Sequence, residues 1–242
     1  LFEQTGLDTR LHVGHAPLAG WAGTLGVQYT DTDLDAFGAE AYIPPSQTEA
    51  LSLFLLERRP FDRLTVDLGG RMERQEVDTE AALRDYSGTA FTLAGGLRWA
   101  FDDALTGALQ ITRSERHPQA AELYANGPHL AVGRFEIGDD RLGTETANTI
   151  DVGLRREGFV HWHASLYYSD FADYIYVAAT GAEEDGLPVF QYVQQDAEFY
   201  GLEAEIEFPL YESEGGALHA RLGGEYVRGE MSNVGNMSQI AQ

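Results

Sequence analysis

The chain has 242 residues, with 39 acidic against 16 basic side chains and a formal net charge of −23. A surface with this charge repels nucleic acid, so a nucleic-acid partner is not expected. Cysteine is absent, which excludes a disulfide framework and thiolate catalysis. Apolar residues make up 43% of the chain, yet no run of them approaches the roughly 18 residues that a membrane-spanning helix needs.

Neither end of the sequence reads as the natural end of a protein. The first residues, LFEQTGLDTR, lack the charged and apolar regions of a signal peptide. The last residues, SNVGNMSQIAQ, resemble a loop. We therefore expect the sequence to be a fragment of a longer chain.

Apolar and polar residues alternate along most of the chain, which is the pattern of strands with one oily face. In residues 64–73, for example, Leu64, Val66, Leu68 and Met72 alternate with Thr65, Asp67, Arg71 and Glu73. The pattern predicts about ten strands, at residues 9–18, 23–37, 47–60, 63–78, 86–101, 104–117, 146–158, 160–178, 189–210 and 217–230. Several reach the 9–11 residues with which a tilted strand crosses a bilayer.

The connections between these segments alternate between short and long. The long ones are predicted near residues 31–46, 79–86, 118–146, 179–189 and 231–242. Short turns at one rim and long loops at the other are typical of an outer-membrane β-barrel. Aromatic residues also cluster near the short turns, as in the interfacial girdles of such barrels: Trp21, Phe61, Trp99, Phe101, Phe159, Trp162, Phe208 and Tyr211.

A soluble β-sandwich is the competing architecture, because a second sheet can bury an oily face as well as lipid can. The charged residues of the other face favour the barrel, since a wet interior accepts them without desolvation. They include Arg71, Arg98, Glu203, Glu205 and Glu207. The predicted fold class is therefore all-β, an antiparallel transmembrane β-barrel.

Several stretches resemble TonB-dependent outer-membrane receptors. They are AYIPPSQTEALSLFLLERRPFDRLTVDLGGRMERQ, RSERHPQAAELYANGPHLAVGRFEIGDDRLGTETANTIDVGLR, DFADYIYV and QYVQQDAEFYGLEAEIEF, in the order that the family shows. The resemblance covers nearly the whole chain. It implies that residues 1–242 are a partial barrel domain, about ten of 22 strands, without the plug domain and the final strands.

The resemblance also implies a function. Such receptors lie in the outer membrane of Gram-negative bacteria and take up a metal ion or metal chelate (siderophore, haem or zinc). The partners would be TonB, contacted through the absent plug, the cargo and outer-membrane lipid, and no cofactor is expected. A passive porin-like channel and a soluble β-sheet binding module remain open as alternatives.

The long loop that begins at His117 holds the candidate binding residues. The resemblance points to Glu122, Tyr124, His129 and Glu136 for substrate binding. Histidine and carboxylate side chains are also ligands that Zn²⁺ accepts, which makes His117, His129, Asp139 and Asp140 the candidate metal ligands. A solvated acidic loop is the alternative interpretation, because the spacing of these residues is irregular.

Two further sequence patterns bear on function. His161 and His163 lie two residues apart on one face of a predicted strand near a short turn, a geometry that can chelate but more often only lines a polar surface. No G-x-S-x-G, H-E-x-x-H or phosphate-binding glycine loop occurs. The sequence therefore does not predict an enzyme.

Overall fold

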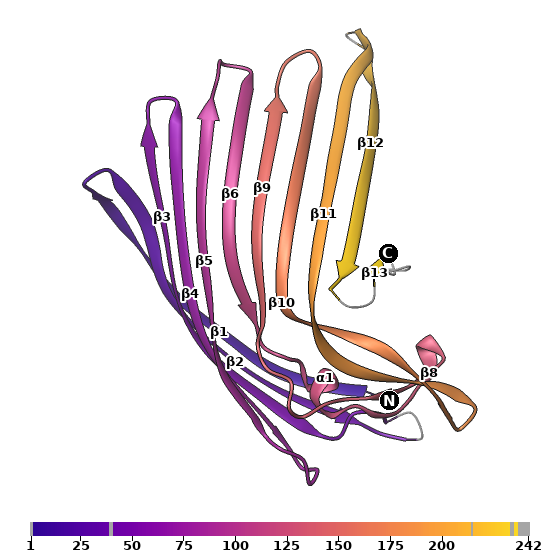
Figure 1. The fold of residues 1–242 in the computed structure, drawn as a ribbon. Helices are drawn as coiled ribbons and strands as arrows, with labels where there is room; N and C mark the ends of the chain where they lie inside the picture. Colours follow the sequence, from indigo (N-terminus) through magenta and orange to yellow (C-terminus); the bar gives the residue numbers. More distant parts are fainter. Residues whose placement is uncertain (1, 39–40, 214, 233–234, 237–242) are drawn as a thin grey trace.

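The computed structural model describes residues 2–38, 41–213, 215–232 and 235–236. Ten long strands follow one another in antiparallel order and form one curved sheet (Figure 1). They are β1 (Phe2–Leu18), β2 (Trp21–Ala36), β3 (Ser46–Phe61), β4 (Leu64–Thr79), β5 (Tyr86–Ala100), β6 (Leu105–Arg116), β9 (Glu145–Arg156), β10 (His161–Glu184), β11 (Leu187–Ser213) and β12 (Gly216–Met231). The short β13 (Gly235–Asn236) pairs with β12, and within the described residues the sheet is open between β1 and β13.

The sheet has one apolar and one polar face, as the alternation predicts. The partners Leu53, Met72 and Phe91 form a row across β3, β4 and β5 on the apolar face. Their side chains are exposed, as are many other large apolar residues of this face, such as Leu68, Leu93 and Leu166. Within the described residues no second sheet or helix covers it, so the competing sandwich architecture is wrong. On β4, Arg71 and Glu73 alternate with Met72 and point to the polar face.

The two ends of the sheet differ. At the turn end, short connections follow Leu18, Phe61, Ala100, Arg156 and Ser213. At the loop end, longer connections follow Ala36, Thr79 and Arg116. The predicted aromatic cluster lies at the turn end. Phe61, for example, is the last residue of β3, and Trp99 is the last but one of β5.

The prediction of a loop at residues 179–189 is wrong for most of these residues, because they belong to two strands. Strand β10 continues to Glu184 and β11 begins at Leu187, so only Asp185 and Gly186 form the turn. Both have positive φ angles, 51° and 76°. An Asp-Gly pair favours this two-residue hairpin turn because both central positions need a positive φ. The result is a long hairpin that extends past its neighbours at the loop end (Figure 1).

The connection between β6 and β9, residues 117–144, is largely structured. It contains α1 (Ala120–Tyr124), β7 (Asn126–His129), η1 (Leu130–Val132) and β8 (Arg134–Ile137). Strand β8 pairs with β7 and lies parallel to β11 at Val189–Gln191. Among the described residues, no helix has the length and apolar character to cross a membrane.

Candidate functional site

The loop between β6 and β9 is anchored on the polar face by two apolar side chains of α1. Leu123 and Tyr124 pack with Val77 of β4, Tyr86 of β5 and Ile175 of β10. Tyr124 is 1% exposed, and its hydroxyl lies 3.0 Å from the carbonyl oxygen of Val77, to which it donates a hydrogen bond. Burial raises the pKa of the Tyr124 phenol to about 12, so it stays a donor at neutral pH. The predicted substrate residue Tyr124 is therefore an anchor of the loop.

Glu122, another predicted substrate residue, holds the start of α1. Its carboxylate accepts a hydrogen bond of 2.8 Å from the backbone N–H of Gln119, as part of a capping box. The same carboxylate pairs with Arg116 at 2.9 Å, and Arg116 also pairs with Glu145 at 3.1 Å. Glu145 in turn accepts a hydrogen bond of 2.8 Å from the backbone N–H of Ile175. This chain of contacts ties the helix to β6, β9 and β10.

Glu136 lies at the centre of the contacts between three loop-end segments. Its side chain is fully buried, at 0% exposure, and accepts hydrogen bonds from three groups. Arg134 Nε lies 2.6 Å away, His129 Nδ1 3.0 Å and the Tyr192 hydroxyl of β11 3.0 Å. His129 stacks on Tyr42 from the loop before β3, with ring centroids 4.5 Å apart. We call these five residues the Glu136 cluster.

The Glu136 cluster stabilises the charged form of its carboxylate. Burial alone would raise the pKa of Glu136, but the hydrogen bonds from Arg134, His129 and Tyr192 outweigh it and hold the pKa below its ordinary value. The burial of Tyr192 and its contact with this carboxylate raise the pKa of the Tyr192 phenol. The His129 side chain remains 29% exposed, so it is the member of the predicted substrate set within the cluster that a ligand can reach.

His117, a predicted metal ligand, is buried at a different place. Its Nδ1 lies 2.8 Å from the Tyr86 hydroxyl, and its Nε2 lies 3.4 Å from the carbonyl oxygen of Glu73. A carbonyl can only accept, so Nε2 carries the proton and Nδ1 accepts from Tyr86. Burial lowers the pKa of His117, which keeps the ring neutral at pH 7. Both ring nitrogens are thus engaged within the protein.

The structure does not bring the four predicted metal ligands together. Asp139 pairs with Arg141 at 3.1 Å, and Asp140 accepts a hydrogen bond of 3.1 Å from the backbone N–H of Arg84. His117 and His129 share no partner with either aspartate. In the part of the chain that the structure describes, no group of three or more His, Asp or Glu residues is placed to hold a metal ion.

A pocket of about 370 Å³ opens at the loop end beside α1 and β8. Tyr124, Asp139 and Asp140 line it, together with Leu83 of the loop after β4. A neighbouring pocket of about 360 Å³ shares Leu83 and Tyr124 and is also lined by Tyr42. Volumes of this size suit small-molecule ligands, and the lining combines carboxylates with aromatic and apolar surface.

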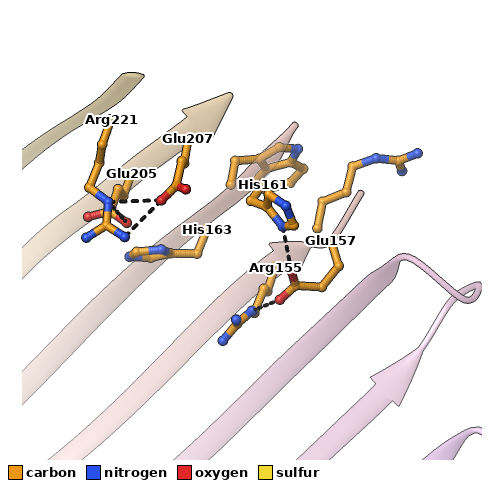
Figure 2. Close-up of a pocket in the computed structure, with 9 residues that line it drawn as sticks. Arg155, Glu157, His161, His163, Glu205, Glu207 and Arg221 are labelled. Atoms are coloured by element: carbon orange, nitrogen blue, oxygen red, sulfur yellow. Dashed lines mark hydrogen bonds and ion pairs between the residues drawn. The ribbon is translucent and has the colours of Figure 1, made fainter. Parts of the chain in front are cut away.

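A third pocket, of about 410 Å³, lies on the polar face at the turn end of β9–β12 (Figure 2). His161 and His163 point to this face, as the sequence predicts from their spacing. His161 pairs with Glu157 at 2.7 Å, His163 lies 3.5 Å from Glu203, and Arg221 pairs with Glu207 at 2.8 Å. The lining therefore consists mainly of arginine, glutamate and histidine side chains from β9 to β12 and the turn before β10.

Several residues of these sites are not predicted from the sequence. Tyr42, Arg134 and Tyr192 complete the Glu136 cluster, and no sequence pattern connects three segments so far apart. An aromatic cluster on β10 and β11 was also missed. Phe171, Tyr174 and Phe199 lie with ring centroids 5.2–5.3 Å apart, near the place where the hairpin extends past its neighbours β9 and β12. The aromatic stretch DFADYIYV was the available signal.

Comparisons with known proteins agree with this architecture. The family model described as TonB dependent receptor-like, beta-barrel, matches residues 2–236. Among solved structures, the copper transporter OprC superimposes with a TM-score of 0.80 at 17% identity, over 97% of this chain and 38% of that one. The FrpB iron transporter from Neisseria meningitidis (F3-3 variant) superimposes with a TM-score of 0.70 at 14% identity, over 95% of this chain and 36% of that one.

The hemophore receptor HasR of Serratia marcescens, solved as a double mutant with its hemophore HasA and heme, gives a TM-score of 0.62 at 13% identity. It is matched over 95% of this chain and 49% of its own. This chain thus spans less than half the length of each of the three structures. The open sheet and its two faces correspond to a section of a barrel wall, and the chain belongs to the TonB-dependent receptor family through its β-barrel domain.

Proposed function

We propose that this chain forms part of the barrel wall of a receptor in the outer membrane of a Gram-negative bacterium, and that the receptor takes up a metal ion or a metal chelate. The observation that carries the proposal is the two-faced sheet. Its exposed apolar face suits lipid, whereas its polar face suits a wet or plugged lumen. The structured loops at one end suit the capture of a ligand from outside the cell.

The names of similar structures support the choice of cargo class. They are described as a copper transporter, an iron transporter and a hemophore receptor bound to heme. Their shared cargo is a transition metal or a complex that contains one. A siderophore, haem or a zinc complex falls within the same class.

We assign different roles to the four predicted substrate residues. His129 would contact the cargo directly, because its ring is partly exposed beside Tyr42. Glu136 is buried beneath it and would position its ring through the 3.0 Å hydrogen bond. Glu122 and Tyr124 would act as positioning residues that hold α1 on the polar face. The aromatic cluster of Phe171, Tyr174 and Phe199 would offer a surface to the organic part of a chelate.

The partner that supplies energy would be TonB, reached through a plug domain outside this chain. Such coupling distinguishes the receptor from a passive porin-like channel, the second candidate. A test is uptake of radiolabelled ferric siderophore, haem, copper and zinc by cells that express the intact receptor. We expect uptake of at least one cargo to stop when a protonophore collapses the inner-membrane potential or when TonB is deleted. Uptake that continues under both conditions would favour the channel.

The assignment of His129 has its own test. In the intact receptor, His129→Ala should weaken binding of the transported cargo, measured by calorimetry on the purified protein. His161→Ala, at the turn end of the sheet, is the matched control and should leave the affinity unchanged. Equal affinities of both variants and the wild type would remove His129 from the binding site.

A further inference from the structure

Arg59 lies on the apolar face, where a cation is not expected. Leu51, Leu53 and Leu55 of β3 point to this face, so alternation places Glu57, Arg59 and Phe61 there as well. Arg59 is two residues from the end of the strand, hence roughly 7 Å along β3 from the turn. The position corresponds to the depth at which barrel walls meet the lipid headgroups.

Two aromatic rings hold the Arg59 guanidinium. Its central carbon lies 4.5 Å from the centroid of the Phe61 ring and 5.9 Å from that of Trp21. Both rings belong to the aromatic cluster of the turn end. Cation–π contacts of this kind fix the position of a guanidinium and leave its N–H donors free for an anion.

The acidic residue two positions before Arg59 on the same face, Glu57, pairs with a histidine instead. Glu57 Oε1 lies 2.8 Å from His15 Nε2 of β1, so the pair spans β2. Gly23 of β2 makes this possible, because a Cβ there would lie 2.6 Å from the Glu57 carboxyl carbon. Within the described residues Arg59 therefore has no carboxylate partner, whereas its neighbour Arg58 pairs with Asp67 on the polar face.

A guanidinium at the hydrocarbon boundary without an acidic partner is stabilised by an anion from its surroundings. The phosphate of a phospholipid lies at this depth and accepts the paired N–H bonds that a guanidinium offers. We infer that Arg59, held between Trp21 and Phe61, binds the phosphate group of a membrane phospholipid at the turn end of the barrel. The inference rests on the proposed location in the outer membrane.

The test compares variants of the intact receptor, extracted from outer membranes in mild detergent and measured by native mass spectrometry with added dioleoylphosphatidylglycerol. The wild type and Arg58→Gln should bind the lipid with similar affinity. Arg59→Gln should bind it about tenfold more weakly or worse, because a hydrogen bond to a charged group is lost. Arg59→Lys should fall between them, since it keeps the charge but loses the paired geometry.

Two controls identify the ligand. Dioleoylglycerol, which lacks the phosphate, should bind the wild type and Arg59→Gln equally. Millimolar inorganic phosphate should not displace the phospholipid, and displacement would show a site for free phosphate instead. Equal phospholipid binding by Arg59→Gln and Arg58→Gln would overturn the inference alone. Absence of the wild type from the outer-membrane fraction would overturn the proposed function and this inference together.

Discussion

An arginine placed on either face of β10 should have opposite consequences. Leu166 lies on the apolar face, is 60% exposed, and pairs across the sheet with Val152 and Leu202. Ser165, its neighbour in sequence, points to the polar face and pairs with Gly153 and Glu203. The two positions share strand and depth, so the face is the main difference between them.

The magnitudes follow from these surroundings. A charge on the lipid face near the middle of the bilayer costs about 2–4 kcal/mol, which is a factor of roughly 30 to 1,000 in the folding equilibrium. Leu166→Arg meets only apolar neighbours, so this cost applies in full. Ser165→Arg meets the Glu203 carboxylate across the strand pair, and an exposed cross-strand pair contributes about 0–1 kcal/mol in its favour.

Folding of the intact receptor into phospholipid vesicles measures the difference. Urea titrations should give Leu166→Arg a free energy of unfolding about 2–4 kcal/mol below the wild type and Ser165→Arg a value within about 1 kcal/mol of it. The amount of heat-modifiable protein in outer membranes should follow the same order. Equal stability of the two variants, or greater harm from Ser165→Arg, would show that the faces are assigned wrongly.

Three other predictions concern local packing and charge. Glu136→Gln should leave Arg134 without its carboxylate. We expect it to lower the stability of residues 126–137 by about 1.5–3 kcal/mol, measured as faster hydrogen exchange of the loop. Unchanged exchange would contradict the role of the cluster. The folded-state pKa of Glu136 is lower than its ordinary value of 4.5, so its contribution to the stability of the loop is fully present above pH 4.5. That contribution is lost as the pH falls through the lower folded-state pKa. The protection of the loop from hydrogen exchange at pH 7 should therefore disappear only in acid. Gly201→Ala places a Cβ 2.6 Å from the Tyr226 carbonyl oxygen and should lower the free energy of unfolding from vesicles by about 1–3 kcal/mol. At Gly224 no heavy atom lies within 4 Å of an added Cβ, so Gly224→Ala should leave the stability unchanged. Equal effects of the two substitutions would refute this account.

The regular part of the fold could be predicted because it depends on short-range alternation. A strand such as β4 shows its two faces in any stretch of ten residues, and lipid and lumen impose the same period on every strand. The sequence predicts β10 and β11 too short, because the alternation of short and long connections favours a loop at residues 179–189. The Asp185–Gly186 pair is the local sequence signal for the two-residue turn that the structure has.

The candidate site could be predicted only in part, because its contacts join distant segments. Closeness in sequence suggested that His117 and Asp139 share a metal. The segments α1, β7 and β8 separate the two residues, so His117 contacts Tyr86 whereas Asp139 pairs with Arg141. Tyr42 meets His129 only because the loop before β3 folds over the same end of the sheet. Such contacts follow from the tertiary structure and have no local signature.

The most direct test of the two-faced wall is site-directed spin labelling along β4 of the intact receptor in vesicles. The sequence has no cysteine, so single cysteines can be placed at each position from 64 to 73 within it. Labels at Val66, Leu68 and Met72 should be relaxed by lipid-soluble oxygen, and labels at Thr65, Asp67 and Arg71 should be protected from it. Oxygen accessibility without a period of two, or labels at Val66 and Leu68 as immobile as those of a dry protein core, would contradict a wall with lipid on its apolar side.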